Sequence, residues 1–211
     1  MRVVLATRNR HKVEELRRIL AAYDVELASL DDFPDVADVA ETGTTFADNA
    51  ILKARAVAAA TGLVALADDS GLSVDALNGM PGVLSARWAG RHGDDVANLE
   101  LVLAQVTDVP DDRRNAAFVC AAAACAPDGR VVLSEGRVEG VLLRAPRGHN
   151  GFGYDPIFVP IGETRTTAEM SAEEKDAISH RGLAFRALAP KLAELSDPPA
   201  AIASPPSDNS Q

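Results

Sequence analysis

Hydrophobic and polar positions in the first third of the chain predict a strand, a helix and a second strand. The β-branched run at residues 2–7 predicts a buried strand, and residues 12–20 place apolar side chains at helical spacing. A further short strand is predicted over residues 25–29. Elements in this order favour a parallel pair of strands and an α/β fold.

The middle of the chain again predicts a helix, a strand and a helix. Thr45, with Asp48 three residues later, is typical of a capping box, and Gly62 should end this helix just after residue 60. A strand is predicted over residues 63–67. After a loop rich in Gly and Pro at residues 78–93, an amphipathic helix is predicted over residues 95–106.

The remaining pattern predicts an antiparallel meander and a last helix. Residues 116–124 are mostly alanine, which favours helix, but the turn at 127–129 and the alternation in 130–135 and 137–143 favour strands. Residues 145–158 form a Gly-rich loop. Ser171 and Glu174 are expected to cap a helix that ends near residue 195. Residues 1–195 are therefore expected to be one domain, followed by a disordered Pro/Ser-rich tail at 196–211.

Composition narrows the classes of function. The chain has 211 residues and a formal net charge of −10, which argues against binding to the backbone of duplex nucleic acid. It has no apolar run near the roughly 18 residues of a membrane span and no signal-peptide pattern, so a cytoplasmic protein is expected. Cys120 and Cys125 are expected to be reduced core thiols on opposite faces of a strand.

The polar turn after the first strand leads directly into a helix. Backbone N–H groups and the positive end of the helix dipole meet at such a turn, which suits an anion, and Lys12 can add a cation. The turn lacks the glycine pattern of a Walker loop. A plain solvated turn is the alternative.

The helix after Thr45 places Asn49 and Lys53 at the edge of its buried stripe, one turn apart. A lysine at the edge of a core either extends to solvent or pairs with an acid. The alternative is a cation held in a cleft, where it would face an anion.

Asp68 and Asp69 follow the strand predicted at residues 63–67. Ligands of open α/β sheets collect at the carboxyl ends of strands. Neighbouring side chains point to opposite faces unless the chain bends, which Ser70 and Gly71 would permit. One acid would then take part in the chemistry, and the other would support the local structure. A divalent cation would keep the first acid ionised, and Glu41 could be a second ligand of that cation. The alternative is that Asp68 caps the next turn and Asp69 pairs with Lys53.

Two later segments carry weaker signals. Residues 151–156 could bring backbone amides and an aromatic ring against a flat ligand, or form a tight turn with Tyr154 packed on the core. Arg181, next to His180, falls among apolar residues of the last predicted helix, where it could hold an internal carboxylate. Together with the phosphate-ready turn, the lysine and the acids, these segments suit a metal-bound nucleoside phosphate.

Five segments between residues 3 and 188 occur together in this order: LATRNRHKVEEL, ETGTTFADNAILKA, ALADDSGLSVDALNGMPGVLSARWAG, GFGYDPIF and EEKDAISHRG. They closely resemble the inosine/xanthosine triphosphate pyrophosphatases, the Ham1-like family of house-cleaning nucleotide hydrolases. The resemblance implies a long central mixed sheet with two lobes flanked by helices, an active site in the cleft between them, and a homodimer. It also implies hydrolysis of ITP, dITP and XTP to the monophosphate plus pyrophosphate with Mg²⁺.

The resemblance also assigns roles to single residues. Asp69 and Lys53 would be catalytic, and Asp69 and Glu41 would hold the metal. The residues that would bind the phosphates or the rest of the nucleotide are Thr7, Arg8, Asn9, Arg10, His11, Lys12, Ser70, Phe152, Gly153, Tyr154, Asp155, Lys175, His180 and Arg181. Donors such as His180, Arg181 or backbone amides, aimed at the carbonyl on C6 of the purine, would select against adenine.

One position departs from the family pattern. The family usually has T-G-N-x-x-K in the first turn, whereas this chain has Arg8 in place of the glycine. Arg8 would be strained if the site required a positive φ, and otherwise would add a cation near the triphosphate. Three other functions remain as alternatives: a Maf-like nucleotide pyrophosphatase of different base preference, a non-catalytic nucleotide-binding protein, and a phosphomonoesterase.

Overall fold

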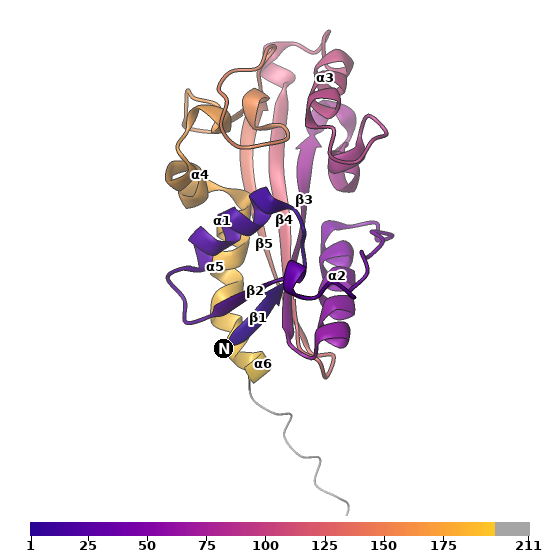
Figure 1. Ribbon diagram of the computed structural model, residues 1–211. Helices are drawn as coiled ribbons and strands as arrows, with labels where there is room; N and C mark the ends of the chain where they lie inside the picture. Colours follow the sequence, from indigo (N-terminus) through magenta and orange to yellow (C-terminus); the bar gives the residue numbers. More distant parts are fainter. Residues whose placement is uncertain (197–211) are drawn as a thin grey trace, which may run out of the picture.

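A mixed six-stranded sheet forms the centre of the computed structural model, which describes residues 1–196 (Figure 1). The strand order is β2-β1-β3-β4-β5-β6. The strands are β1 (Arg2–Leu5), β2 (Glu26–Ser29), β3 (Val64–Val74), β4 (Asn115–Cys125), β5 (Val131–Leu142) and β6 (Phe158–Pro160). β1 runs parallel to β2, as predicted, and also to β3, and the other pairs are antiparallel. The tail was predicted at 196–211. Ser196 is the last residue of a short helix instead, and residues 197–211 lie outside the described residues.

Helices cover both faces of the sheet. They are α1 (Arg10–Leu20), α2 (Phe46–Thr61), α3 (Asp95–Gln105), α4 (Ala172–Ile178), α5 (His180–Leu188) and α6 (Ala193–Ser196). α1 and α5 pack on one face and α2 on the other, while α3 lies toward the far end of the long strands (Figure 1). No helix within residues 1–196 combines the length and apolar character needed to cross a membrane.

The alanine-rich segment is a strand, as predicted, because it lies in the middle of the sheet between two layers of helices. Ala122 and Ala124 of β4 belong to the core cluster with α1 and α5, whereas Ala121 and Ala123 belong to the cluster with α2. Small side chains on both faces let the helices approach the sheet closely. Cys120 and Cys125 are buried free thiols that belong to different clusters, which confirms that they face opposite sides.

The predicted strand at residues 63–67 is too short. β3 continues to Val74, and Asp68 and Asp69 pair in register with Ala122 and Ala121 in the middle of the strand. The carboxylates therefore do not follow the end of a strand, because the long partner β4 continues the pairing past them. The two strands predicted at 130–135 and 137–143 are likewise one strand, β5, which passes through Gly136.

The predicted single C-terminal helix is also wrong, because Ser179 divides it. Ser179 has extended backbone (φ −67°, ψ 151°), and its side chain accepts a hydrogen bond from the amide of Gly182 at the start of α5. Ser171 and Glu174 form the predicted capping box, but at the start of the short α4. The predicted box of Thr45 and Asp48 and the stop at Gly62 (φ 68°) are both confirmed for α2.

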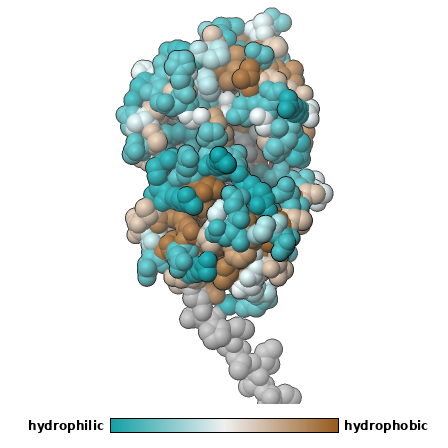
Figure 2. Space-filling model, in the orientation of Figure 1, coloured by the Kyte–Doolittle hydropathy of each residue, from teal (hydrophilic) through white to brown (hydrophobic). Residues whose placement is uncertain are grey.

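The cavity lies where one edge of β3 has no neighbouring strand. β1 last pairs with β3 at Leu5 and Leu66, and the amide of Ala6 bonds to the carbonyl of Leu66. The loop that follows β3 returns to its edge only at Leu72, whose amide bonds to Ser85 Oγ (2.9 Å). Between Leu66 and Leu72 no other described strand covers this edge. The molecule thus has two halves, one with α1 and α2 and the other with α3 (Figure 1), and Figure 2 shows a recess between them.

Candidate active site

A cavity of about 570 Å³ lies between the two halves and collects most of the site residues predicted from the sequence. Those that line it are Thr7, Arg8, Asn9, Lys12, Glu41, Lys53, Asp69, Ser70, Phe152, Gly153, Tyr154, Asp155, Lys175, His180 and Arg181. Arg10 is exposed at the start of α1 and does not line the cavity. His11 does not line it either, although its ring stacks on that of Phe152 with centroids 5.4 Å apart.

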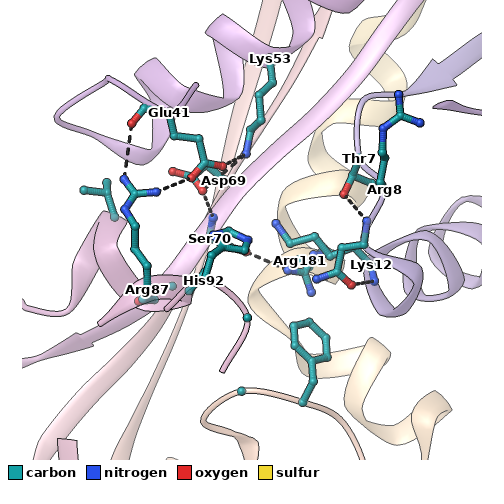
Figure 3. Close-up of a pocket in the computed structure, with 18 of the residues that line it drawn as sticks. Thr7, Arg8, Lys12, Glu41, Lys53, Asp69, Ser70, Arg87, His92 and Arg181 are labelled. Carbon is teal, nitrogen blue, oxygen red and sulfur yellow. Dashed lines mark hydrogen bonds and ion pairs between the residues drawn. The ribbon is translucent and has the colours of Figure 1, made fainter. Parts of the chain in front are cut away.

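Asp69 is a buried carboxylate that faces α2. Its Oδ2 accepts a hydrogen bond from Asn49 Nδ2 (2.9 Å), and its Oδ1 lies 3.6 Å from Lys53 Nζ (Figure 3). Burial raises the pKa of Asp69 and nearby Glu41 raises it further, while Lys53 partly offsets the rise. The pairing of Asp69 with Lys53, which the sequence offered as an alternative, is therefore present in the structure. A base with a raised pKa is a stronger proton acceptor.

Glu41 shares the same lysine. Its Oε1 lies 2.7 Å from Lys53 Nζ, and its Oε2 lies 3.3 Å from Arg87 Nη1 (Figure 3). Burial opposes the charge on Glu41, but Lys53 outweighs it and holds the pKa of this carboxyl below its usual range. Two carboxylates thus meet at one ammonium group, in a cavity wide enough for a ligand.

Asp68 faces the opposite side of β3 and has a different environment. Its Oδ2 lies 3.0 Å from Lys12 Nζ and 3.2 Å from Arg181 Nε, and it accepts a hydrogen bond from Ser70 Oγ (3.0 Å). Burial would raise the pKa of Asp68, but Lys12 and Arg181 outweigh it and hold the pKa well below its usual range. Asp68 therefore does not cap a turn, which corrects that alternative.

A chain of buried charges continues behind Asp68. Arg181 also donates a hydrogen bond to Glu15 of α1, and Lys175 Nζ lies 2.9 Å from Glu15 Oε1 and 2.7 Å from Asp155 Oδ2. These four residues are at most 6% exposed. The expectation that Arg181 holds an internal carboxylate is confirmed, since Asp68 and Glu15 both receive its hydrogen bonds.

The Gly-rich loop presents one ring to the cavity, and two of its amides donate to carboxylates of the protein. The amide of Phe152 donates to Asp155 Oδ2 (2.8 Å), and that of Gly153 donates to Asp95 Oδ2 (2.9 Å). Tyr154 is buried and its hydroxyl donates to the carbonyl of Ser85, as in the tight-turn alternative. The Phe152 ring remains at the cavity, with Lys175 Nζ 5.0 Å from its centroid.

His180 is the first residue of α5 and lies against the core. Its ring stacks on Phe118 with centroids 4.8 Å apart. Burial lowers the pKa of His180 well below its usual value, and Arg181 and Lys175 lower it further. The imidazole is therefore neutral at pH 7, with one ring nitrogen able to donate and the other able to accept.

The first turn is built as a helix N-terminus. Asn9 caps α1 by accepting a hydrogen bond from the amide of Lys12, and Thr7 Oγ1 accepts one from the amide of Asn9. Arg8 is not among the residues with positive φ, so the strain considered from the sequence is absent. Its guanidinium contacts Asp38 and other residues of the following loop.

Sequence reasoning missed Glu15, Arg87 and Asp95. Glu15 lies four residues before Ile19 on the buried side of α1, so a charge on an apolar face was the available signal. Arg87 lies in the Gly- and Pro-rich loop, and Asp95 is the first residue of α3. Nothing in the local sequence indicates that either residue reaches a segment so far away in the chain.

Comparisons with known proteins agree on one family. The model of the Ham1 family matches residues 3–191. A dITP/XTP pyrophosphatase of Streptomyces coelicolor is 61% identical over 196 residues, which cover 92% of this chain and 98% of the relative. One of Mycobacteroides abscessus is 58% identical over 198 residues, covering 92% and 96%.

Solved structures give the same result. The crystal structure of a nucleoside-triphosphatase, dITP/XTP pyrophosphatase, from Mycobacterium abscessus has a TM-score of 0.74 and 59% identity, covering 91% of this chain and 99% of that one. A HAM1 protein from Coxiella burnetii has a TM-score of 0.83 and 43% identity, with coverage of 92% and 99%.

Proposed function

This chain belongs to the Ham1 family and is a nucleoside-triphosphate pyrophosphatase of non-standard purine nucleotides, and we propose that Asp69, Lys53 and Glu41 form its reaction centre. Its reaction converts dITP, XTP or ITP to the monophosphate and pyrophosphate. The observation that carries the assignment of the centre is Asp69, a buried carboxylate of raised pKa beside a lysine in the central cavity.

The phosphates are proposed to lie between the N-terminus of α1 and Lys53. Lys12 and Lys53 reach the cavity from α1 and α2, and each is paired with an acid of β3. The helix N-terminus adds N–H groups and a favourable dipole for an anion. Cations and amides held in place before the reaction stabilise the charge that develops on the leaving pyrophosphate.

The donor set of the site fits Mg²⁺. Glu41 and Asp69 both approach one ammonium group, Lys53 Nζ, so a cation already occupies the space between them. Mg²⁺ is commonly held by one or two carboxylates plus phosphate oxygens and water. Within residues 1–196 no group of three or more His, Cys, Asp or Glu side chains gathers, so the protein would supply only the two carboxylates. When bound, Mg²⁺ would neutralise charge on the phosphate oxygens.

Asp69 is proposed to orient the attacking water and accept its proton. Its Oδ2 is fixed by Asn49, and its Oδ1 accepts a hydrogen bond from the amide of Ser70 (3.1 Å). The carboxylate therefore has one orientation on β3, and its raised pKa suits it to take a proton as water attacks the α–β phosphoanhydride. Lys53 keeps Asp69 ionised until then.

The purine is proposed to lie near Phe152, Lys175 and His180. The Phe152 ring offers a stacking surface, and neutral His180 can donate a hydrogen bond to a carbonyl on C6. Arg181 is less suited to donate to the base, because Asp68, Glu15 and Ser70 already receive its hydrogen bonds. A buried donor left unpaired by the amino group of adenine would select against ATP.

We also propose that the protein is a cytoplasmic homodimer. The relationship to the Ham1 family supports the dimer, and the absence of a spanning helix within residues 1–196 is compatible with the compartment. Sedimentation equilibrium at micromolar concentration tests the dimer, and cell fractionation tests the compartment.

One assay tests the reaction. The purified protein is incubated with Mg²⁺ and, separately, ITP, XTP, dITP, ATP and dTTP, and the products are identified by ³¹P NMR. Pyrophosphate and a monophosphate from the non-standard purines are expected, with little turnover of ATP. Orthophosphate would indicate a phosphomonoesterase, preference for dTTP would indicate the Maf-like alternative, and binding without turnover would indicate a nucleotide sensor.

A further inference from the structure

We propose that Arg8 is a positioning residue that ties the phosphate-binding turn to the chain segment carrying Glu41. This segment, residues 30–41, is called the strap below. The proposal rests on the proposed function, because it concerns how the two sides of the same site are held together.

The side chain of Arg8 makes its hydrogen bonds to the strap. Its Nη2 donates to the carbonyl of Val36 (2.7 Å), its Nε to Asp38 Oδ1 (3.2 Å), and its Nη1 to the carbonyl of Leu30 and to Asp31 Oδ1 (both 3.4 Å). Figure 3 shows this side chain directed away from Lys12. Arg8 is therefore engaged with the wall of the cavity rather than aimed at the phosphates.

The part of the strap beyond Val36 needs such a tie, whereas residues 30–36 have backbone hydrogen bonds and pack on the core. Within the described residues, positions 37–42 make no hydrogen bond between backbone groups. Beyond Val36, the polar contacts of the strap come from Arg8 at one end and from Lys53 and Arg87, both on Glu41, at the other. The strap lines the cavity from Ala37 to Glu41, so its position sets both the cavity wall and the Glu41 carboxylate.

The geometry links this tie to the phosphate turn. Arg8 lies between Thr7 and Asn9, whose hydrogen bonds build the N-terminus of α1. A fixed turn thereby fixes the near end of the strap. The pairs with Asp31 and Asp38 involve acids that are 72% and 87% exposed, so each contributes little alone. The directional bond to the Val36 carbonyl is the main tie, since it is short and charge-assisted.

Arginine is suited to this role for a geometric reason. A planar guanidinium has five donors in a rigid fork and can reach several acceptors at once, whereas an ammonium group is a single point. Glycine, the residue expected at this position from the family pattern, has no side chain and could not make these hydrogen bonds. The departure at Arg8 therefore has a structural purpose in this chain.

The test compares Arg8→Ala and Arg8→Lys with Arg17→Ala, which removes an exposed cation from α1, the helix that follows Arg8. The first readout needs no substrate: digestion with a protease that cleaves before aspartate, mapped by mass spectrometry, measures how open the strap is at Asp35 and Asp38. The second readout is kcat, the KM for ITP, and the Mg²⁺ concentration at half-maximal rate.

For Arg8→Ala we expect cleavage within the strap to accelerate, and both KM and the Mg²⁺ requirement to rise by about tenfold, the effect of losing one good hydrogen bond. We expect kcat to change less than KM, Arg8→Lys to be intermediate, and Arg17→Ala to match the unmutated protein. Unchanged cleavage in Arg8→Ala, or faster cleavage with an unchanged Mg²⁺ requirement and KM, overturns the proposal. Failure of the unmutated protein to release pyrophosphate overturns the proposed function instead, and the protease readout still decides whether Arg8 holds the strap.

Discussion

Two adjacent aspartates on one strand have opposite environments, although their sequence context is nearly the same. Side chains of neighbouring strand residues point to opposite faces, so Asp68 meets α1 and α5 while Asp69 meets α2. Asp68 lies between two cations that lower its pKa, whereas burial, with a smaller contribution from Glu41, raises the pKa of Asp69. The two carboxylates therefore suit different roles, a structural one for Asp68 and the reactive one proposed for Asp69.

Asp69→Asn is expected to remove most of the turnover and to leave the fold intact. The amide cannot accept a proton from water, and loss of a general base costs about 10²- to 10⁴-fold in rate. The measurements are kcat with ITP and the midpoint of thermal unfolding. Asp108→Asn, at an exposed position, is the control and should behave as the unmutated protein. A near-normal rate in Asp69→Asn would show that another group activates the water.

Asp68→Asn is expected to act mainly on stability. The Asp68 side chain is fully buried, and its replacement leaves Lys12 and Arg181 without their shared counter-charge. Removing one partner of a buried ion pair costs about 3–5 kcal/mol of the free energy of unfolding. Urea unfolding measures this loss. In the control, Asp111→Asn breaks the exposed pair with Arg144 and should cost less than about 1 kcal/mol. Equal losses in the two variants would contradict the structural role of Asp68.

At the scale of elements, local chemistry predicted the ends of helix α2 better than it predicted the length of strand β3. The box of Thr45 and Asp48 and the stop at Gly62 depend only on neighbouring residues, and both were predicted correctly. The extension of β3 past Asp68 could not be predicted, because it depends on pairing with β4, some fifty residues away. The break at Ser179 did have a local signal, a serine that can cap a helix, which the continuing apolar pattern concealed.

The site shows the same division between local and distant causes. Lys12, Lys53 and Asp69 could be identified from their positions on predicted elements and from the family resemblance. The pairing of Glu15 with Lys175 and Arg181 joins residues at least 160 positions apart, so no local pattern reveals it. Arg87 reaches Glu41 from the end of a short 3-10 helix, in a segment whose sequence shows no regular periodicity. Positions on single elements were therefore predictable, and contacts between distant elements were not.

Gly136 of β5 offers a test of how an element positions the site. A Cβ at this position would collide with the carbonyl of His180 and lie 2.7 Å from the amide of Ala184, both backbone atoms of α5. Gly136→Ala should therefore push α5 off the sheet and cost about 1–3 kcal/mol of stability, as overpacking does. Because α5 carries His180 and Arg181, the KM for ITP should rise as well.

Urea unfolding and steady-state kinetics with ITP measure the two effects of Gly136→Ala. The exposed neighbour Glu135 provides the control, Glu135→Ala, which should change neither quantity appreciably. Full stability together with an unchanged KM in Gly136→Ala would mean that α5 can shift without consequence for the nucleotide site.

At the scale of the whole molecule, buried charges join segments that the sheet alone does not connect. Lys175 of α4 links α1 to the Gly-rich loop through Glu15 and Asp155, and Arg181 of α5 links α1 to β3. The two halves around the cavity are thus connected through ion pairs next to the proposed nucleotide position. Because these groups must stay charged, and His180 neutral, the stability of the entire fold should depend on pH.

As the pH is lowered, the free energy of unfolding is expected to decrease in two stages. Burial holds the pKa of His180 well below its usual 6.5, so below about pH 6.5 the unfolded chain takes up a proton that the folded protein does not. Burial would raise the pKa of Glu15, but Arg181 and Lys175 outweigh it and lower that pKa below its usual 4.5. A second loss therefore begins near pH 4.5, because again the unfolded chain binds the proton first. Each such proton removes up to about 1.4 kcal/mol per pH unit.

Urea unfolding at intervals between pH 8 and pH 4 measures both stages, and His180→Gln separates them. Glutamine cannot take up a proton, so this variant should lose the slope between about pH 6.5 and pH 5 and keep the loss that begins near pH 4.5. His149→Gln, at an exposed position, is the matched control and should keep both stages. If His180→Gln retained the upper slope, the proton would be taken up elsewhere, and a neutral buried His180 could not be the donor proposed for the purine. The pH profile of stability therefore tests the base-binding assignment without any substrate present.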